Sequence, residues 1–281
     1  MIVFSSLTSV QIYTVATIAV LLWFGTGRQP LDPVYRFFRA LVTSRTYWIY
    51  LAAALAILLV NGYEVKWEAA YGVAYDLTQA WTGWEGDWHV RLQSLLRSDW
   101  LTAVCAFFYV VVFQSVIVAS LGIYTSFERK KMYYAFCVAL LLNYVIALPM
   151  YWFVPINEVW YAHPQVHPLI VDAFPSFEQT YRPMSGINNC FPSLHTSLSV
   201  TMALLASRSG IRRWAVFAWI NAAVIVFSIF YLGIHWFTDM AAGVLLAIVS
   251  ATVGLKLGDR IDLNALQREM GTASKKAFSN Q

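Results

Sequence analysis

Two histidines, each close to another polar side chain, are the residues of this chain whose types and spacing could do chemistry. His195 follows Ser193 by two positions in the sequence FPSLHTS, and Asp239 follows His235 by four positions in the sequence GIHWFTD. Each of these stretches lies at a break next to a long apolar run. Polar side chains at such breaks have little reason to be there unless they meet a partner or a ligand.

The spacing of His235 and Asp239 favours a histidine nucleophile. A carboxylate that accepts a hydrogen bond from Nδ1–H fixes the tautomer of an imidazole and makes its other nitrogen more basic. On a helix, the four-residue spacing would place both side chains on one face. The alternative is a capping or hydrogen-bonded pair without a catalytic role. Asp239, Gly243 and Ala247 share that face, and the small residues would permit close helix contact.

Ser193 and His195 open an apolar run, directly after Pro192, which suits the first turn of a helix. Backbone N–H groups at the start of a helix attract anions. A phosphate bound there would meet these groups and the Ser193 hydroxyl, and His195 could protonate a leaving alkoxide. Taken alone, a Ser-x-His pair at a helix start is equally compatible with a structural role.

The composition predicts an all-α, polytopic membrane helical bundle that forms a single integral membrane domain over residues 1–281. Hydrophobic residues make up 59% of the chain and charged residues only 12%, whereas a soluble domain usually has about 25% charged residues. Apolar runs of ~20 residues are long enough to span a bilayer. Seven candidate spans are found, at 8–26, 46–61, 100–124, 132–154, 193–207, 214–232 and 238–257. The second and the fifth are short, so six spans remain possible.

The distribution of Lys and Arg predicts the orientation of these spans. Basic residues follow spans one, three, five and seven: Arg28, Arg36, Arg39, Arg45, Arg129, Lys130, Lys131, Arg208, Arg212, Arg213, Lys256 and Arg260. The other loops are acidic or neutral. We therefore expect the N-terminus outside, the C-terminus in the cytoplasm, and both histidine stretches at the outer membrane surface.

Three segments outside the spans have distinct expected roles. Aromatic residues that include Trp67, Tyr71 and Tyr75 recur at helical spacing within residues 62–99, which predicts outer interfacial amphipathic helices. These helices would serve as an anchor or as a wall for a lipid substrate. Residues 155–192 are polar and interrupted by prolines, and we expect them to form an outer active-site loop. Residues 258–281 are predicted to form a cytoplasmic tail.

The sequence offers no Gly-rich phosphate loop and no zinc-type Cys spacing, so neither a cofactor nor a metal is expected. His163 and His167 stand four residues apart, but Pro164 and Pro168 argue against a regular helix that would pair them on a metal. Nothing indicates a nucleic-acid partner, and the oligomeric state is not readable.

Together, the two histidine stretches resemble the second and third motifs of the type 2 phosphatidic acid phosphatase superfamily. That family includes vanadium haloperoxidases, inositol phosphorylceramide synthases and sphingomyelin synthases. The resemblance covers roughly residues 140–257, and it implies a six-helix core, here with one extra N-terminal span. It also implies a metal-free phospho-histidine mechanism in which His235 attacks phosphorus and Asp239 orients it. By the same resemblance, His195 protonates the leaving group and Ser193 holds the phosphoryl oxygens.

The chain departs from the family pattern in its cations. The first motif, Lys-x6-Arg-Pro, survives only as Arg182-Pro183, with Pro175 at the Lys position. Leu194 replaces the glycine of the second motif, and Ile229 replaces the arginine of the third. The reduced third motif resembles the inositol phosphorylceramide and sphingomyelin synthase branch.

The resemblance therefore predicts an enzyme that acts on lipid phosphate esters at the outer membrane face. A phosphorane-like transition state needs positive charge or donors around its oxygens, and we expect Arg182 to supply them with Asn188 or Asn189. Transfer of an inositol phosphate-type headgroup is favoured. The alternatives are hydrolysis of phosphatidic acid-like or polyprenyl phosphates, and a non-enzymatic lipid-binding protein or transporter, which the missing cations suggest.

Overall fold

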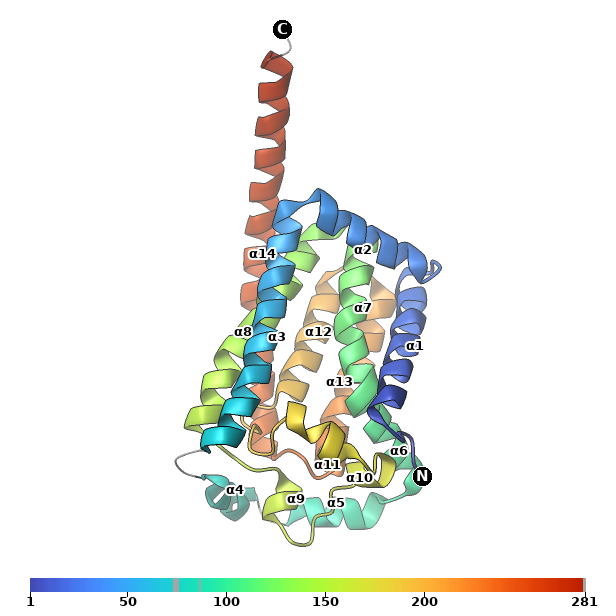
Figure 1. Ribbon diagram of the computed structural model, residues 1–281, viewed down its shortest axis with the longest axis vertical. Coiled ribbons are helices and arrows are strands. Elements are labelled where there is room, and N and C mark those ends of the chain that lie inside the picture. Colours follow the sequence, from blue (N-terminus) through green and yellow to red (C-terminus); the bar gives the residue numbers. More distant parts are fainter. Residues whose placement is uncertain (73–75, 86, 280–281) are drawn as a thin grey trace.

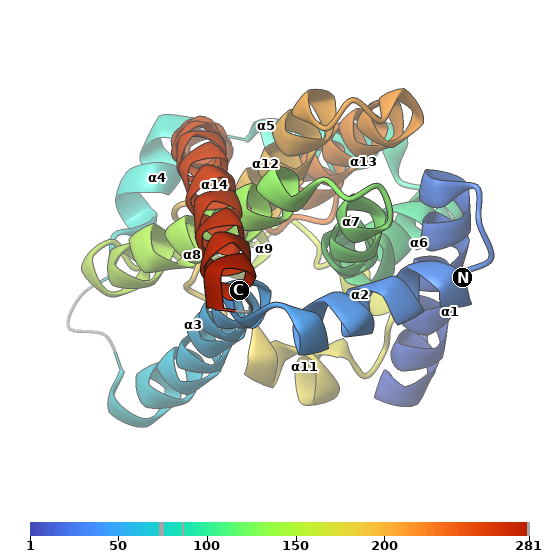
Figure 2. The ribbon, with the colours of Figure 1, turned by 90° about the horizontal axis from the view of Figure 1, so that it is seen from above.

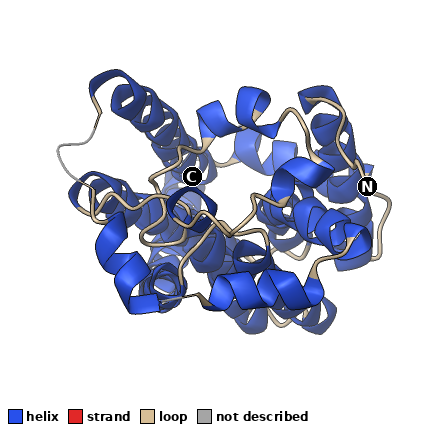
Figure 3. Ribbon diagram, turned by 90° about the horizontal axis from the view of Figure 1, so that it is seen from below, coloured by secondary structure: helices blue, strands red, loops and turns tan. Residues whose placement is uncertain are grey.

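A computed structural model of the chain describes residues 1–72, 76–85 and 87–279, with the backbone alone described at residues 68–69 and 264–279. Tyr75 of the predicted interfacial segment and the last two residues of the predicted tail lie outside this description. Within the described ranges the chain forms helices and loops, and one isolated bridge pairs Ile156 with Asn189 (Figure 3). The prediction of an all-α polytopic bundle is confirmed.

Each of the seven predicted spans corresponds to a helix or to a continuous helical run (Figure 1). These are α1 (Leu7–Thr26), α3 (Arg45–Tyr71), α6 (Asp99–Phe107) with η1 (Phe108–Val112) and α7 (Phe113–Ser126), α8 (Lys130–Phe153), α12 (Leu194–Arg208), α13 (Arg212–Tyr231) and α14 (Phe237–Ser279). All except α12 are long and apolar enough to cross a membrane. With 15 residues, α12 is shorter than the ~20 residues that a bilayer requires.

The second span is longer than the sequence predicted. The expected boundaries were 46–61, whereas α3 continues through the start of the predicted interfacial segment to Tyr71. Gly62 is the only residue with poor helix propensity in this extension. Gly72 follows with a φ of 68°, a left-handed conformation that ends helices.

The two ends of the bundle differ, and we call them the loop end and the tail end. The loop end carries α4 (Thr78–Glu85), α5 (Trp88–Leu96), α9 (Val159–Ala162), α10 (Ile170–Ala173), α11 (Phe177–Thr180) and η2 (Arg182–Met184). At the tail end, α2 (Leu31–Thr43) crosses between α1 and α3, and the C-terminal part of α14 projects beyond the bundle (Figures 1 and 2).

The connections predicted to be basic meet at the tail end. Arg213, at the start of α13, donates from Nε to the carbonyl oxygen of Gly25, at the end of α1, over 3.1 Å. Lys131, at the start of α8, lies 3.5 Å from the carboxylate of Asp259 on α14. The structure thus groups the basic loops at the end opposite the histidine stretches, and the side of the membrane that each end faces remains a prediction.

The close contact between α12 and α14 positions both histidine stretches. A Cβ atom at Gly243 of α14 would lie 2.6 Å from the carbonyl oxygen of Ser193 and 3.0 Å from Cβ of Thr196. Only a residue without a side chain permits this approach. The expected close contact on the face of Gly243 is therefore present, and it holds the start of α14 against the start of α12.

Candidate active site

His195 and His235 line the same cavity at the loop end of the bundle. The cavity has a volume of about 180 Å³, and the centroids of the two imidazole rings are 6.2 Å apart. Its wall also includes Asn61, Tyr109, Phe113, Tyr144, Tyr151, Glu158, Tyr181, Asn189, Cys190 and Leu194. Two histidines that are forty residues apart in the sequence therefore line one cavity.

His235 and Asp239 meet across the start of α14, and they are not on one helical face as the spacing suggested. His235 lies in the loop that follows α13, because α14 begins only at Phe237. The loop turns at Gly233, whose φ of 78° favours glycine. Oδ2 of Asp239 lies 3.4 Å from Nδ1 of His235 and accepts a hydrogen bond from the N–H of Trp236 at 3.0 Å. Both side chains are buried.

His195 is held between two aromatic rings. Its imidazole stacks on Tyr109 with a centroid distance of 4.0 Å and an interplanar angle of 16°, and Phe113 lies 4.4 Å away. Tyr109 belongs to η1, a single π-helical turn, and π turns are frequent at functional sites. The aromatic contacts fix the plane of the imidazole beside the cavity.

Ser193 is the N-cap of α12. Its hydroxyl accepts a hydrogen bond from the N–H of Thr196 at 3.3 Å, and its own N–H donates to the carbonyl oxygen of Asp239 at 3.1 Å. The side chain is fully buried. The expectation that Pro192 lies in the first turn is wrong. Ser193 is the N-cap and α12 begins at Leu194, so Pro192 precedes the helix.

Arg182 is engaged with two carboxylates. Its Nη1 and Nη2 atoms lie 2.6 and 2.8 Å from the oxygens of Glu158, and its Nε and Nη2 atoms each lie 3.0 Å from an oxygen of Glu178. Burial alone would lower the pKa of Arg182, but the charges of Glu158 and Glu178 raise it above the usual range. The guanidinium therefore remains charged. Its partner Glu158 lines the cavity, whereas Arg182 is not among the lining residues.

The two asparagines differ in position. Asn189 lines the cavity, and its Nδ2 donates to Oε2 of Glu64 at 3.2 Å. Its Oδ1 is buried without a hydrogen-bond partner among the described residues. The backbone carbonyl of Asn188 accepts a hydrogen bond from Ile156 at 3.1 Å, so this residue fixes the loop beside the cavity.

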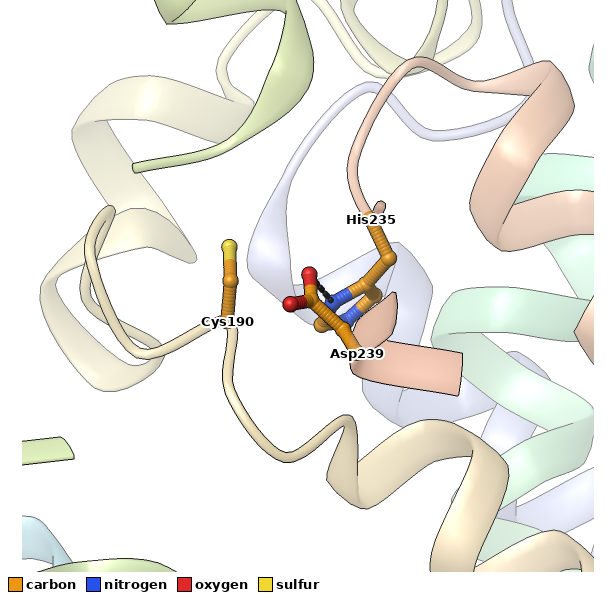
Figure 4. A group of neighbouring side chains, drawn as sticks. All are labelled: Cys190, His235 and Asp239. Atoms are coloured by element: carbon orange, nitrogen blue, oxygen red, sulfur yellow. Dashed lines mark hydrogen bonds and ion pairs between the residues drawn. The ribbon is translucent and has the colours of Figure 1, made fainter. Parts of the chain in front are cut away.

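One cluster of described residues offers metal-ligating atoms at this site. Cys190, His235 and Asp239 each contribute one such atom, all within 4.8 Å of one another (Figure 4). Burial and the charge of Asp239 raise the pKa of the Cys190 thiol well above its usual value, which disfavours the thiolate that a metal requires. Of the two histidines considered for a metal in the loop, the side chain of His163 lies 3.0 Å from Asp87, and the backbone of His167 is hydrogen-bonded to Gln93.

Three polar residues around the site were missed in the sequence. Glu85, His89 and Gln93 come from the segment over α4 and α5, and each accepts from or donates to the backbone around His235. These three polar residues recur every four positions among aromatic residues. That spacing is a signal that could have indicated side chains directed to one common surface. Tyr109, Tyr144 and Tyr151 of the cavity wall were missed because they occur inside apolar spans.

Comparison with known proteins is consistent with this arrangement. No curated protein and no solved structure matches the chain significantly. A family model described as the PAP2 superfamily matches residues 76–253, which is more than half of the chain and contains every cavity-lining residue except Asn61. Both histidine stretches and the segment over α4 and α5 fall inside the match. The chain therefore belongs to the PAP2 superfamily.

Proposed function

We propose that this protein is a membrane lipid phosphotransferase, which moves a phosphoryl headgroup from a lipid phosphate ester through a phospho-histidine intermediate. Membership of the PAP2 superfamily supports a phosphatase-type enzyme acting on lipid phosphates. The observation that carries the proposal is the shared cavity, which both His195 and His235 line, with their ring centroids 6.2 Å apart. That separation leaves room for a phosphoryl group between a nucleophile and a general acid.

In the first half of the reaction, Nε2 of His235 attacks phosphorus. A P–N bond forms, the P–O bond to the leaving group breaks, and His195 gives its proton to the departing alkoxide. Oδ2 of Asp239 accepts the hydrogen bond from Nδ1–H of His235 and stabilises the positive charge that develops on the ring. Their distance of 3.4 Å is long for a hydrogen bond, as is common for catalytic contacts without substrate.

In the second half, an acceptor hydroxyl attacks the phosphorus atom of the intermediate. His195 now takes the hydroxyl proton, the P–N bond breaks, and His235 is regenerated. If the acceptor is a lipid or polyol alcohol the reaction is transfer, and if it is water the reaction is hydrolysis. The same residues serve both outcomes.

Positive charge at the phosphate has two sources in this proposal. Leu194 and His195 lie at the cavity in the first turn of α12, where backbone N–H groups attract anions. Ser193 supports this turn as its cap. Arg182 supplies the cation, and the phosphate oxygens replace Glu158 as its partner. Exchange of one anionic partner for another retains the pairing of the buried guanidinium.

The lining of the cavity supports transfer over hydrolysis. Tyr144 and Tyr151 bring phenol groups to the wall, and Asn61 and Asn189 bring amides. Such neutral donors and acceptors suit a hydroxyl-rich acceptor, for example an inositol-type polyol. The reduced cation set of the motifs supports the same branch of the family.

We also propose that the loop end faces the extracytoplasmic side, with the N-terminus outside and the C-terminus in the cytoplasm. The grouping of the basic connections at the tail end supports this orientation, because cytoplasmic loops carry an excess of Lys and Arg.

The test is turnover of labelled lipid phosphate esters in proteoliposomes, with and without a polyol acceptor. We expect label to move to the acceptor and to be released as phosphate only in its absence. His235→Ala should abolish turnover, whereas His163→Ala, a control outside the cavity, should retain it. Full turnover by His235→Ala would refute the mechanism. Orthovanadate, a phosphate mimic, should stabilise the detergent-solubilised wild type, and it should leave a non-enzymatic scaffold unchanged.

A further inference from the structure

The loop that carries His235 is bonded by other segments along its whole backbone. The carbonyl oxygens of Gly233 and Ile234 accept hydrogen bonds from the N–H groups of Trp160 and Val159, at 2.9 and 3.2 Å. The N–H groups of Ile234 and His235 both donate to the carbonyl oxygen of Ile229. Buried backbone groups are almost always paired in this way. The carboxylate of Asp239 accepts from the N–H of Trp236 at 3.0 Å. Three further partners are the side chains of Glu85, His89 and Gln93.

Glu85 caps α14 from outside the helix. One carboxylate oxygen accepts from the N–H of Phe237 at 2.6 Å, and the other accepts from the N–H of Thr238 at 2.8 Å and from its hydroxyl at 2.6 Å. The first N–H groups of a helix have no partner within the helix, and a carboxylate at this end also interacts favourably with the helix dipole. Glu85 therefore fixes where α14 begins, two residues after His235.

His89 holds the backbone of His235 itself. Its Nε2 lies 3.1 Å from the carbonyl oxygen of His235, and since a carbonyl only accepts, Nε2 carries the proton. The ring is buried and contacts Trp88 at a centroid distance of 3.8 Å and Trp236 at 5.7 Å. Burial lowers the pKa of His89 to about 4, so the ring is neutral near pH 7 and keeps one donor for this contact.

Gln93 holds the other side of the turn. Its Nε2 donates to the carbonyl oxygens of Tyr231 at 3.0 Å and His167 at 2.9 Å, and its Oε1 accepts from the N–H of His167 at 2.9 Å. The side chain is almost fully buried. A Cβ atom at Gly233 would lie 3.1 Å from Nε2 of Gln93, so the turn is packed directly on this amide.

We propose that Glu85, His89 and Gln93 are positioning residues that set the place of the His235 imidazole in the cavity. This inference rests on the proposed role of His235 as nucleophile. Tyr231, His235 and Phe237, whose backbone groups they bind, lie before, at and after the nucleophile. A shift of any of these peptides moves the imidazole relative to His195 and Asp239.

The expected consequence is a loss of rate with little loss of substrate binding. None of the three residues is part of the cavity wall, so their removal leaves the groups that contact the substrate in place. Misplacement of a reacting group by about 1 Å costs about 100-fold in rate. The contact of His235 with Asp239, at 3.4 Å, is too long to hold the ring by itself.

The experiment uses substitutions that keep volume and remove hydrogen bonds, namely Glu85→Gln, His89→Phe and Gln93→Met. His89→Gln is the rescue variant, because a glutamine amide nitrogen can reach the position of Nε2. Ser209→Ala is the control. Ser209 is also buried and also makes two hydrogen bonds to backbone groups: its hydroxyl donates to the carbonyl oxygen of Ala206 at 2.7 Å and accepts from the N–H of Ile211 at 3.1 Å. It lies between α12 and α13 at the tail end, away from the site.

For the full-length protein in detergent, we expect kcat on a labelled lipid phosphate ester to fall by about 10-fold to 100-fold in His89→Phe and Gln93→Met. KM should change by less than about threefold, because the binding groups remain in place. His89→Gln should recover most of kcat, and Ser209→Ala should retain it. Equal kcat values for the wild type and the three site variants would overturn the proposal.

We call Glu85, His89 and Gln93 the clamp. Hydrogen–deuterium exchange of the peptide that covers residues 232–240 tests whether the clamp holds this loop, without relying on turnover. Exchange should accelerate in the three site variants and stay unchanged in Ser209→Ala. Unchanged exchange in the site variants would overturn the clamp even if the wild type is active. If exchange is faster in the variants but the wild type is inactive, the proposed function is rejected. The clamp would then hold the loop without a catalytic role.

Discussion

The imidazole of His195 lies flat on the phenol ring of Tyr109, with the two ring centroids 4.0 Å apart and the ring planes 16° apart. Tyr109 is buried in the π-helical turn η1, where one extra residue per turn changes the direction in which side chains point. Phe113, at the start of α7, closes the other side of the imidazole at 4.4 Å. The bundle therefore fixes the plane of His195 from a neighbouring helix, while α12 fixes its backbone.

Two substitutions of Tyr109 test the contribution of its aromatic ring and that of its hydroxyl group separately. Aromatic pairs contribute about 0.5–1.5 kcal/mol beyond their buried area, so we expect Tyr109→Leu to lower kcat by about 3-fold to 10-fold as His195 loses its orientation. Tyr109→Phe keeps the ring and should remain within about twofold of the wild type. Turnover measurements on both variants check this. Phe217→Leu, which removes a stacked ring beside Trp214 at the tail end, is the control and should not alter kcat.

Asp239→Asn tests the orienting carboxylate. The asparagine retains an oxygen for the N–H of Trp236, but its amide cannot neutralise the imidazolium that forms when His235 attacks phosphorus. Loss of such a carboxylate lowers kcat by about 10⁴-fold in a serine protease triad, and we expect a fall of at least about 100-fold here. Asp32→Asn, an acid paired with Arg28 and Arg36 on α2, is the matched control. A kcat for Asp239→Asn within about tenfold of the wild type would contradict the orienting role.

Glu158→Gln tests whether phosphate competes for Arg182. Glu158 lines the cavity and holds the guanidinium with two contacts at 2.6 and 2.8 Å. Removal of its charge should make Arg182 more available, so we expect vanadate to bind about threefold to tenfold more tightly, a gain of about 1 kcal/mol in binding free energy. Glu178→Gln changes the second partner, which is half exposed, and should have a smaller effect. Weaker vanadate binding by Glu158→Gln would show that Arg182 has a structural role alone.

The sequence predicted the bundle because apolar runs and basic loops are local features. It also indicated the pair of His235 and Asp239, since residues four positions apart stay close both on a helix and across a helix start. The pairing of Arg182 with Glu178 follows from the same spacing, but its pairing with Glu158 depends on how residues 155–192 fold. Long-range contacts of this kind leave no periodic signal.

The clamp also depends on long-range contacts that the sequence does not reveal. His89 binds a carbonyl oxygen 146 positions away, and its aromatic neighbours in the sequence indicated only an interfacial helix. The residues of the cavity wall could not be predicted for a different reason. Tyr109 and Tyr151 lie inside apolar helices, where an aromatic residue is more often part of the core than of a site.

Acid should destabilise the folded protein through His89. Its pKa is about 4 in the fold, because burial outweighs the contacts with the His235 carbonyl and Glu85 that would raise it, and His163 lowers it further. The ordinary value is 6.5, so as the pH falls the unfolded chain binds the proton first. Stability from this group is therefore constant above about pH 6.5 and is lost between about pH 6.5 and pH 4, by up to about 3 kcal/mol.

Thermal unfolding in detergent across this pH range checks the prediction. His89→Phe has no proton to bind at this position, so its melting temperature should fall less steeply with acid than that of the wild type. The two slopes should agree above about pH 6.5, where the histidine is neutral in both states. Parallel curves over the whole range would show that His89 is not held neutral by the fold.

Gly243→Ala tests how strictly the distance between α12 and α14 is set. The added methyl group would lie 2.6 Å from the carbonyl oxygen of Ser193, so α14 must move away from α12, and Asp239 moves with it. Gly254→Ala creates the same 2.6 Å approach to a backbone oxygen, that of Ala135 on α8. Overpacking of this kind costs about 1–3 kcal/mol, so both variants should have lower melting temperatures.

Only Gly243→Ala should also lower kcat at a temperature where both variants are folded, because only its contact lies between the residues that hold the two histidines. Equal kcat values for the two variants would mean that the contact at Gly243 stabilises the bundle without setting the geometry of the site.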